Sequence, residues 1–406
     1  MDLDLGPEVA QFRAELRAWI TAEAPAELAG LTDWNTFTGA GGSRSGEVAA
    51  AMKHPAYREW EARLQARRLI CAQWPEEYGG GGLDPVRATV VAEEFYRAGL
   101  PRVTRGSGEI LVGPSVIAHG TPEQQAHFLP RILSGEDVYC QGFSEPNHGS
   151  DLAALETKGV VDGDEIVITG QKVWTSGAAG ANMIFILVRT DPTVPKHNGI
   201  SFVLLDFTGA GVEYRPIRQM TGAAEFAEDF FDGARAPLFN VIGGLNNGWR
   251  VTMTTLSYER GGSATVQYMG FERAYWELVE TARKFGKTTD PLVRQQLAWA
   301  YTQVQLMKFN GQRTLAQLAA GRTPGPEASI DKLFWSEYFK RVGEIAVGIE
   351  GTSALVRPAG DGYATGRWQD DFLAARPATI YAGSNEIQRN IIGERVLGLP
   401  KEPRVA

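Results

Sequence analysis

The spacing of apolar residues changes twice along the chain, and this change limits the folds that the chain can adopt. Up to about residue 135 the apolar side chains recur at helical spacing, Val138–Ile242 contains short strand-like runs separated by turn signals, and after Gly248 the helical spacing returns. This order predicts an α+β protein with several domains. The predicted domains are an N-terminal α-helical domain (1–136), a middle β-barrel-like domain (137–242) and a C-terminal four-helix bundle (243–406).

Two helices of the first block carry clear end signals. Asp84 precedes Pro85 and can cap a helix in which proline occupies the first position, and Gly99 ends that helix. Thr121 and Gln124 form the pattern of a capping box at the start of another helix. Residues 36–47 are rich in glycine and serine and are predicted to form a surface loop.

The other predicted elements lie in the second and third blocks. The predicted strands are Glu165–Trp174, Met183–Val188, Ile200–Asp206 and Gly211–Arg215. The predicted long helices are Trp249–Phe285, Pro291–Ala320, Pro326–Ile349 and Trp368–Leu397. Four helices of this length joined by short breaks predict a bundle.

Composition excludes several functions. The net charge of −8 argues against a general nucleic-acid binder, and no apolar run approaches the ~18 residues of a membrane-spanning helix. Two cysteines, Cys71 and Cys140, cannot form a disulfide framework, so we expect a cytoplasmic protein. The five histidines lack metal-site spacing, and the motifs of serine hydrolases and phosphate-binding loops are missing from the sequence.

Glu259 is the most unusual residue of the third block. It lies in an otherwise apolar helical stretch, and Arg260, Gly261 and Gly262 follow it directly. A carboxylate is rarely buried without a partner, because removing its charge from water is costly. Two interpretations follow from the local sequence: a base within a pocket, or a Glu–Arg pair on a helix surface.

Four motifs appear in order along the chain. They are Trp74–Gly80 (WPEEYGG), Phe143–Asp151 (FSEPNHGSD), Gly170–Ser176 (GQKVWTS) and Ile380–Arg389 (IYAGSNEIQR). With the helix–strand–helix order, they make the chain resemble the acyl-CoA dehydrogenase family over nearly its whole length. The resemblance implies an FAD enzyme that oxidises an acyl-CoA thioester between Cα and Cβ to the trans-2-enoyl-CoA and passes electrons to an electron-transferring flavoprotein.

The resemblance also implies which residues act. Members of the family place a catalytic glutamate either in the C-terminal signature, where this chain has Ala382, or on the first bundle helix before an arginine, where it has Glu259 and Arg260. Glu259 is therefore the expected α-proton base. The expected FAD contacts are Phe143, Ser144, Ser150, Trp174, Thr175, Ser176, Arg283, Gly351, Ser384 and Glu386, and the expected acyl-CoA contacts are Ser150 and Arg260. Considered without the motif, Trp174 would be a core aromatic at a strand end.

Three positions depart from the family pattern. Asn147-His148 replaces a common Gly-Ala, and His148 is either a ligand contact or a solvent-facing loop residue. Ala282 occupies the position of an arginine that reaches a neighbouring subunit's flavin, with Arg283 displaced by about 100° on the helix. Glu350-Gly351 stands where many members have Gly-Gly.

Two alternatives to a homo-oligomeric dehydrogenase remain. An acyl-CoA oxidase would share the first half-reaction and pass electrons to oxygen. A hetero-oligomer with a related chain would divide the FAD contacts between unlike subunits, and Glu259 would make this chain the catalytic half. The acyl group of the substrate is not defined by the sequence, although a base at position 259 is compatible with long, branched or ring-bearing groups.

Overall fold

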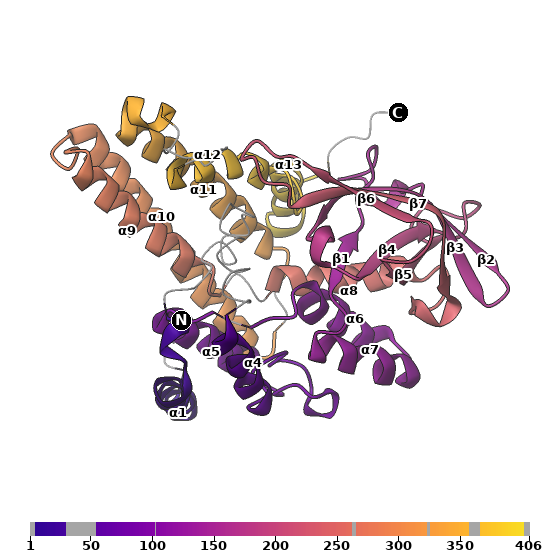
Figure 1. Cartoon of the computed structure of the whole chain (residues 1–406). Coiled ribbons are helices and arrows are strands. Elements are labelled where there is room, and N and C mark those ends of the chain that lie inside the picture. Colours follow the sequence, from indigo (N-terminus) through magenta and orange to yellow (C-terminus); the bar gives the residue numbers. More distant parts are fainter. Residues whose placement is uncertain are drawn as a thin grey trace.

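A computed structural model describes residues 5–29, 54–101, 103–261, 265–322, 325–356 and 366–401. For residues 258–261 it describes the backbone only. N-terminal helices, a sheet and a helical bundle form three parts, with the sheet and the bundle on opposite sides of Figure 1 and the N-terminal helices below them. The predicted loop at residues 36–47 lies outside the described residues.

The N-terminal part is helical, as predicted. Its elements are α1 (Pro7–Glu23), a 3₁₀ turn (Ala26–Leu28), α4 (Pro55–Ala66), a 3₁₀ turn (Glu76–Tyr78), α5 (Pro85–Ala98), a π-helical turn (Gly108–Val112), α6 (Gly113–His119) and α7 (Pro122–Ser134). The Asp84 carboxylate accepts a hydrogen bond from the amide of Arg87 at 2.9 Å, and Gly99 ends α5 in the left-handed conformation. The capping box of α7 is present, with the Thr121 amide donating to the Gln124 side chain at 2.8 Å. Both predicted helix starts are confirmed.

The middle part is an eight-stranded mixed sheet. Its strands are β1 (Tyr139–Gly142), β2 (Lys158–Asp162), β3 (Glu165–Ser176), β4 (Met183–Arg189), β5 (Ile200–Asp206), β6 (Val212–Ile217), β7 (Phe226–Pro237) and β8 (Val241–Ile242). The order is β6-β7-β3-β2-β4-β5-β8, and β1 pairs with β4 in parallel. The four predicted strands correspond to β3, β4, β5 and β6, whereas β1, β2, β7 and β8 were not predicted.

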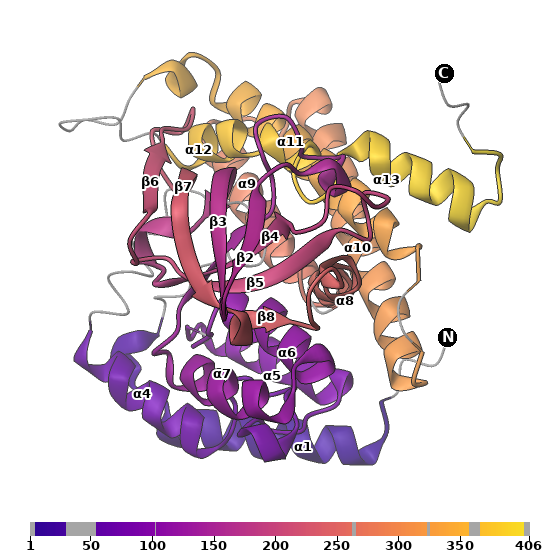
Figure 2. The same cartoon turned by 90° about the vertical axis from the view of Figure 1, so that its right-hand side faces the viewer.

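The interior of the sheet is apolar at most positions. Ile166 and Ile168 of β3 belong to one buried cluster with Ile186 of β4, Val203 of β5 and Phe231 of β7. The cluster also includes residues of β1 and β8, and Figure 2 shows the twist of the sheet between β3 and β5. Lys172, Thr175 and Asp229 are buried polar exceptions in β3 and β7.

The C-terminal part is a helical bundle with more breaks than the sequence predicted. Its elements are α8 (Gly248–Gly261), α9 (Tyr268–Lys284), α10 (Pro291–Ala319), α11 (Ala328–Glu350), a 3₁₀ turn (Gly351–Leu355), α12 (Arg367–Ala374), a 3₁₀ turn (Pro377–Thr379), α13 (Asn385–Ile391) and a π-helical turn (Ile392–Val396). The predicted helices that correspond to α10 and α11 are confirmed. No helix among the described ranges is long and apolar enough to cross a membrane.

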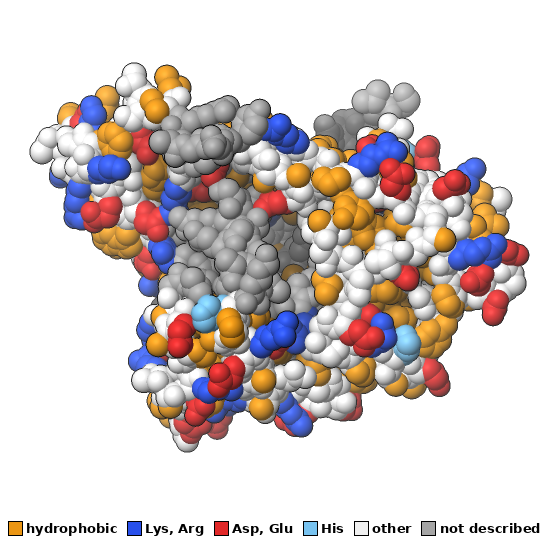
Figure 3. Space-filling model, in the orientation of Figure 1, with side chains coloured by type: hydrophobic (Ala, Val, Ile, Leu, Met, Phe, Trp, Pro, Cys, Tyr) orange, Lys and Arg blue, Asp and Glu red, His pale blue; other side chains and the backbone are white. Residues whose placement is uncertain are grey.

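Two single long helices were predicted wrongly. The stretch predicted as Trp249–Phe285 is divided into α8 and α9, and residues 265–267 form a turn before α9. The stretch predicted as Trp368–Leu397 is divided because Pro377 lacks an amide hydrogen for the helix and because Ala382 and Gly383 have positive φ angles of 52° and 82°. Figure 3 shows acidic and basic side chains interspersed over the visible face of the molecule.

Candidate active site

A bulge near the end of β3 turns Trp174 outward. The pairing of β3 with β7 shifts between Val173 and Thr175, and Trp174 has a φ angle of 65°. Its side chain is 60% exposed and meets the ring of Phe226 edge-on at a centroid distance of 6.4 Å. A left-handed conformation in a residue other than glycine costs about 1–3 kcal/mol. The strained backbone places the Trp174 ring on the surface. An exposed aromatic ring of this kind can stack against a flat ligand.

The segment after β1 lies beside this bulge. Phe143 is buried, and its ring contacts those of Phe185 and Phe202 at centroid distances of 5.4 and 6.2 Å. The carbonyl of Ser144 accepts a hydrogen bond from the amide of Val173 at 2.9 Å. The structure therefore brings together Phe143, Ser144 and Trp174, three of the predicted cofactor residues.

A buried ion pair holds the same segment to β3. The Lys172 ammonium lies 2.8 Å from the Glu145 carboxylate and donates to the Phe143 carbonyl at 3.2 Å. Glu145 also accepts hydrogen bonds from the amides of Glu156 and Thr157 at 2.7 and 2.9 Å. Burial lowers the pKa of Lys172 to about 8 despite the attraction of Glu145. Burial alone would raise the pKa of Glu145, but Lys172 and the two amides lower it.

The remaining residues of these two motifs point in different directions. Ser150 and Ser176 are exposed, so their hydroxyl groups are available to a ligand. Thr175 is buried, and its hydroxyl donates to the Asp229 carboxylate inside the sheet. His148 is partly buried, with Nε2 3.7 Å from the Glu156 carboxylate. Any contact of Thr175 with a ligand would therefore use its backbone.

The helix that carries Glu259 is fixed to the N-terminal part. In α8 the Thr255 hydroxyl lies 2.7 Å from that of Ser115 in α6, and Thr254 Oγ1 lies 2.7 Å from Nε2 of His119. α8 also packs against β5, as Figure 2 shows. Glu259 and Arg260 are in the last turn of this helix. Their side chains lie outside the described residues.

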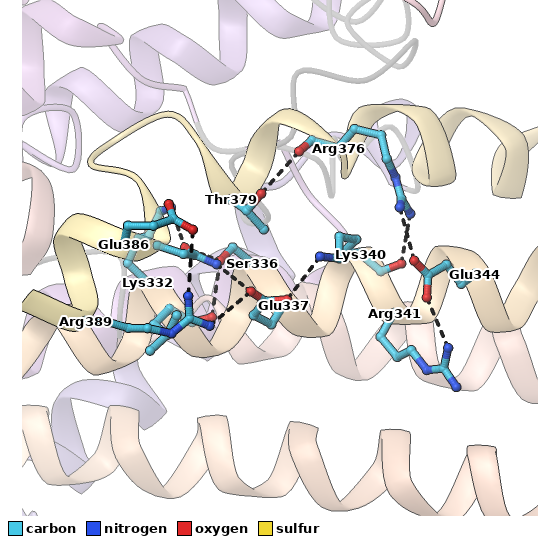
Figure 4. Close-up of polar contacts among 12 residues, drawn as sticks. Lys332, Ser336, Glu337, Lys340, Arg341, Glu344, Arg376, Thr379, Glu386 and Arg389 are labelled. Atoms are coloured by element: carbon cyan, nitrogen blue, oxygen red, sulfur yellow. Dashed lines mark hydrogen bonds and ion pairs between the residues drawn. The ribbon is translucent and has the colours of Figure 1, made fainter. Parts of the chain in front are cut away.

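The C-terminal signature is attached to α11 by Asn385. The buried Asn385 oxygen accepts hydrogen bonds from Lys332 Nζ at 2.9 Å and from the Ser336 hydroxyl at 3.0 Å. Its amide nitrogen donates to the Glu337 carboxylate at 2.9 Å. The neighbouring residues are drawn in Figure 4. Ser384 caps α13 by accepting from the amide of Ile387 at 3.3 Å.

Glu386 also lies on the solvent side of this region. It is exposed and lies 3.9 Å from Arg389 (Figure 4). Hydrogen bonds from its own amide and from Ser384 lower the pKa of Glu386, so it is ionised at neutral pH. The two predicted cofactor residues Ser384 and Glu386 both lie at the start of α13, Ser384 as its N-cap and Glu386 in its first turn.

The other two predicted cofactor residues lie at a tip of the bundle. Arg283 is near the end of α9 and Gly351 directly follows α11. Figure 1 shows the bundle helices α9 and α11 on the side of the molecule opposite the sheet. Ala282 is fully buried, whereas Arg283 is exposed and paired with Glu280. The two neighbouring positions thus face in different directions, as the 100° rotation per residue predicts.

Sequence reasoning did not assign a role to the buried polar residues. Glu145, Lys172 and Asn385 all lie within the quoted motifs, but none was expected to hold a motif in place. Lys172 lies two positions before Trp174 in a predicted strand, and this spacing could have indicated a buried ion pair. A charged side chain on the buried face of a strand requires a partner of opposite charge. Asp229 gave no such signal, because β7 itself was not predicted.

Comparison with known families covers all three parts of the chain. Residues 43–136 match the N-terminal domain of acyl-CoA dehydrogenases, residues 140–232 match the middle domain and residues 246–397 match the C-terminal domain. The chain belongs to the acyl-CoA dehydrogenase family and is therefore an oxidoreductase. The predicted family, fold class and enzyme class are confirmed.

Individual relatives are similar over nearly their full length. The acyl-CoA dehydrogenase IpdE1 of Mycobacterium tuberculosis is 42% identical over 400 residues, which cover 98% of this chain and 99% of the relative. A solved structure described as the Tcur3481-Tcur3483 steroid ACAD has a TM-score of 0.80 at 31% identity and covers 99% of this chain and 100% of its own. The ChsE4-ChsE5 complex of M. tuberculosis has a TM-score of 0.78 at 28% identity, with coverage of 99% and 100%.

Proposed function

We propose that this enzyme is an FAD-dependent acyl-CoA dehydrogenase that converts an acyl-CoA thioester to the trans-2-enoyl-CoA, with Glu259 as the base. The observation that carries this proposal is the exposed Trp174 ring on a strained bulge beside Ser144. Members of the family are generally FAD-dependent, which supports the choice of FAD as the ligand of that surface.

The residues near the bulge fit a flavin ring. The Trp174 indole offers an exposed aromatic surface, and the exposed Ser176 hydroxyl and the Ser144 backbone can donate or accept hydrogen bonds at its edge. When bound there, FAD would accept the hydride that leaves Cβ of the substrate. Ser384 and Glu386 are proposed to contact the ADP half of the cofactor.

Glu259 is proposed to remove the proton from Cα of the acyl group. Position 259 follows Thr255 by one helical turn, on a helix that is hydrogen-bonded to α6 and packed against β5. A base must stay fixed relative to the carbon that it deprotonates, and these contacts fix its helix. Ala382, at the alternative family position, has no titratable group. We assign Ser150 and Arg260 to acyl-CoA binding.

The first test is an anaerobic visible spectrum of the purified enzyme before and after addition of acyl-CoAs. Bleaching of the flavin band by a substrate would support the dehydrogenation. Replacing Glu259 with Gln should slow flavin reduction by about 10²–10⁴-fold while FAD and ligand still bind, because the amide cannot accept the proton. The matched control is Glu165→Gln on an exposed hairpin, which should reduce flavin at the wild-type rate. Near-normal flavin reduction in the Glu259→Gln enzyme would contradict the assignment of Glu259 as the base.

We propose a ring-bearing acyl group as the substrate class. The support is the likeness to a structure whose title names a steroid acyl-CoA dehydrogenase, at 31% identity over 99% of this chain. The panel of acyl-CoAs should therefore contain straight, branched and steroid-derived groups matched in concentration. Faster bleaching by a straight-chain acyl-CoA than by any ring-bearing one would contradict this choice.

An electron-transferring flavoprotein is proposed as the electron acceptor. The oxidase alternative predicts that the reduced enzyme reoxidises rapidly in air with release of hydrogen peroxide. Stopped-flow mixing of the reduced enzyme with oxygen or with an electron-transferring flavoprotein compares the two acceptors directly. A faster reaction with oxygen would favour the oxidase. The predicted cytoplasmic location stays a prediction.

We further propose that the enzyme works as an oligomer of acyl-CoA dehydrogenase chains. Arg283 lies at the end of α9 and Gly351 directly follows α11, and Figure 1 shows the bundle on the side of the molecule opposite the sheet, so we propose that these two residues contact a cofactor held by a neighbouring chain. Leu292, Trp299 and Phe309 expose large apolar side chains on α10, and an open groove of about 480 Å³ lies between α10 and α11. Native mass spectrometry of the chain alone, and co-expressed with a related chain, separates homo-oligomers from hetero-oligomers.

A further inference from the structure

The bulge in β3 decides which face of the sheet carries Trp174. In a regular strand, side chains alternate, so Trp174 would share the inner face with Lys172 two positions earlier. In the structure Lys172 and Thr175 are fully buried and Trp174 is 60% exposed. The extra residue at the bulge shifts the alternation by one position. Removing the bulge would therefore exchange the faces of Trp174 and Thr175.

A buried hydrogen bond fixes this shifted alternation. The Thr175 hydroxyl donates to Oδ2 of Asp229 on the neighbouring strand β7. Both side chains are fully buried, and within the described ranges Oδ1 of Asp229 has no hydrogen-bond partner. If Thr175 turned outward, the Asp229 carboxyl group would lose this contact while it remained inside the sheet. A buried polar group without a partner is strongly unfavourable, so the pair opposes the regular strand.

Asp229 is otherwise difficult to explain by packing. It occupies an inward position of β7 opposite Lys172, and the other inward positions of that strand hold Ala227, Phe231, Ala234 and Ala236. Lys172 is already paired with Glu145, and its ammonium donates to the Phe143 carbonyl. An apolar residue would fill the same space in the core without the cost of burying a carboxyl group. The hydrogen bond from Thr175 is therefore the contact that explains a carboxyl group at position 229.

We propose that Asp229 is a positioning residue for Trp174. By holding Thr175 inside the sheet, it maintains the bulge and keeps the indole on the outer face. Asp229 itself does not touch the ligand. The consequence for catalysis rests on the proposed function, because it requires that the ring that meets Trp174 is the flavin.

The test compares Thr175→Val with Thr175→Ser in the full-length protein. Valine has nearly the shape of threonine but cannot donate, whereas serine keeps the donor. The protein is labelled with 5-fluorotryptophan, and its ¹⁹F resonance for Trp174 is assigned with Trp174→Phe. In Thr175→Val the Trp174 resonance should move in cofactor-free protein, and FAD should bind about 3- to 10-fold more weakly, the amount expected from losing one aromatic contact. Thr175→Ser should restore both wild-type values.

A second buried hydroxyl of the same sheet provides the control. Ser201 in β5 is fully buried and accepts a hydrogen bond from the amide of Asn246 at 2.9 Å. Ser201→Ala should reduce thermal stability without moving the Trp174 resonance or changing FAD affinity. If Thr175→Val does not fold, the experiment uses Thr175→Ala instead. Alanine also removes the hydrogen-bond donor and places no additional methyl group against Asp229.

The outcomes separate the two proposals. An unchanged Trp174 resonance in the hydroxyl-free variant, or an equal shift in Ser201→Ala, overturns the role of Asp229 and leaves the proposed function standing. A shift in the resonance of Thr175→Val, reversed by serine, supports the role of Asp229. If that shift is found in a protein that binds no FAD even as wild type, the positioning of Trp174 is upheld and the proposed function fails.

Discussion

The two motifs that we assign to the cofactor are held in place by different chemistry. The Phe143–Ser144 segment is attached to β3 by an ion pair whose lysine and glutamate side chains are 0% and 6% exposed. The charged side chains around the C-terminal signature are open to water, with Arg389 54% and Glu337 40% exposed. Water screens the second group of charges and not the first, so equal numbers of ion pairs do not mean equal stabilisation.

The largest expected effect is on the buried pair. Replacing Lys172 with Met should lower the free energy of unfolding by about 3–5 kcal/mol, because the Glu145 charge would stay buried without its partner. Urea denaturation measures this change. The double variant Glu145→Leu with Lys172→Met should recover part of the loss, since no unpaired charge remains. If Lys172→Met lowered the free energy of unfolding by less than about 1 kcal/mol, the buried ion pair would stabilise no more than an exposed one.

A smaller effect should appear in the pH dependence of stability. Burial raises the pKa of Asp229 to about 6, and its neighbours are Thr175, Cys140, Glu228 and, across the ladder, Lys172. The folded state binds this proton more tightly than the unfolded chain, whose aspartate titrates near pH ~3.9. The stabilisation from Asp229 is thus complete below pH ~4 and is lost as the pH rises through ~6.

Asp229→Asn removes this dependence. Between pH ~4 and ~7, wild-type stability should fall relative to that of the variant by at most about 3 kcal/mol. Urea unfolding of both proteins across this range measures the difference. Parallel stability curves would show that Asp229 does not titrate there.

The smallest effect is expected in the exposed network of Figure 4. Arg389→Ala should change the free energy of unfolding by less than about 1 kcal/mol, and added salt should reduce the difference further. Asn385→Ala, in the same helix but buried, is the matched comparison and should cost about 1–3 kcal/mol, because it removes the hydrogen bonds of a buried amide to Lys332, Ser336 and Glu337. Equal losses in the two variants would show that burial does not decide the stabilisation.

Local signals predicted much of the fold. Asp84, Gly99 and Thr121 act through their own backbone neighbours, so the ends of α5 and α7 could be predicted from a few residues. β4 and β5 are continuous apolar runs and were equally clear. The domain boundaries after residues 136 and 242 stay predictions.

The elements that were missed depend on distant contacts. The inward positions of β7 include Asp229 and three alanines, so the strand lacks a strong apolar alternation. Its pairing with β3 stabilises it, and that pairing is not visible in a local window. The motifs of the candidate site were located from the resemblance, but the outward turn of Trp174 and the inward turn of Thr175 required the bulge. The predicted roles of Glu259 and the cofactor residues stay predictions.

The ion pair between Glu145 and Lys172 also has a consequence for the order of folding. Its partners are separated by 27 positions in the chain, and Glu145 binds the amides of Glu156 and Thr157 as well. The connecting segment can take its final shape only after β3 has docked, because the amides of Glu156 and Thr157 donate to a Glu145 side chain that Lys172 holds. The amide hydrogens of Glu156, Thr157 and Val173 should therefore exchange with solvent together, in one cooperative opening.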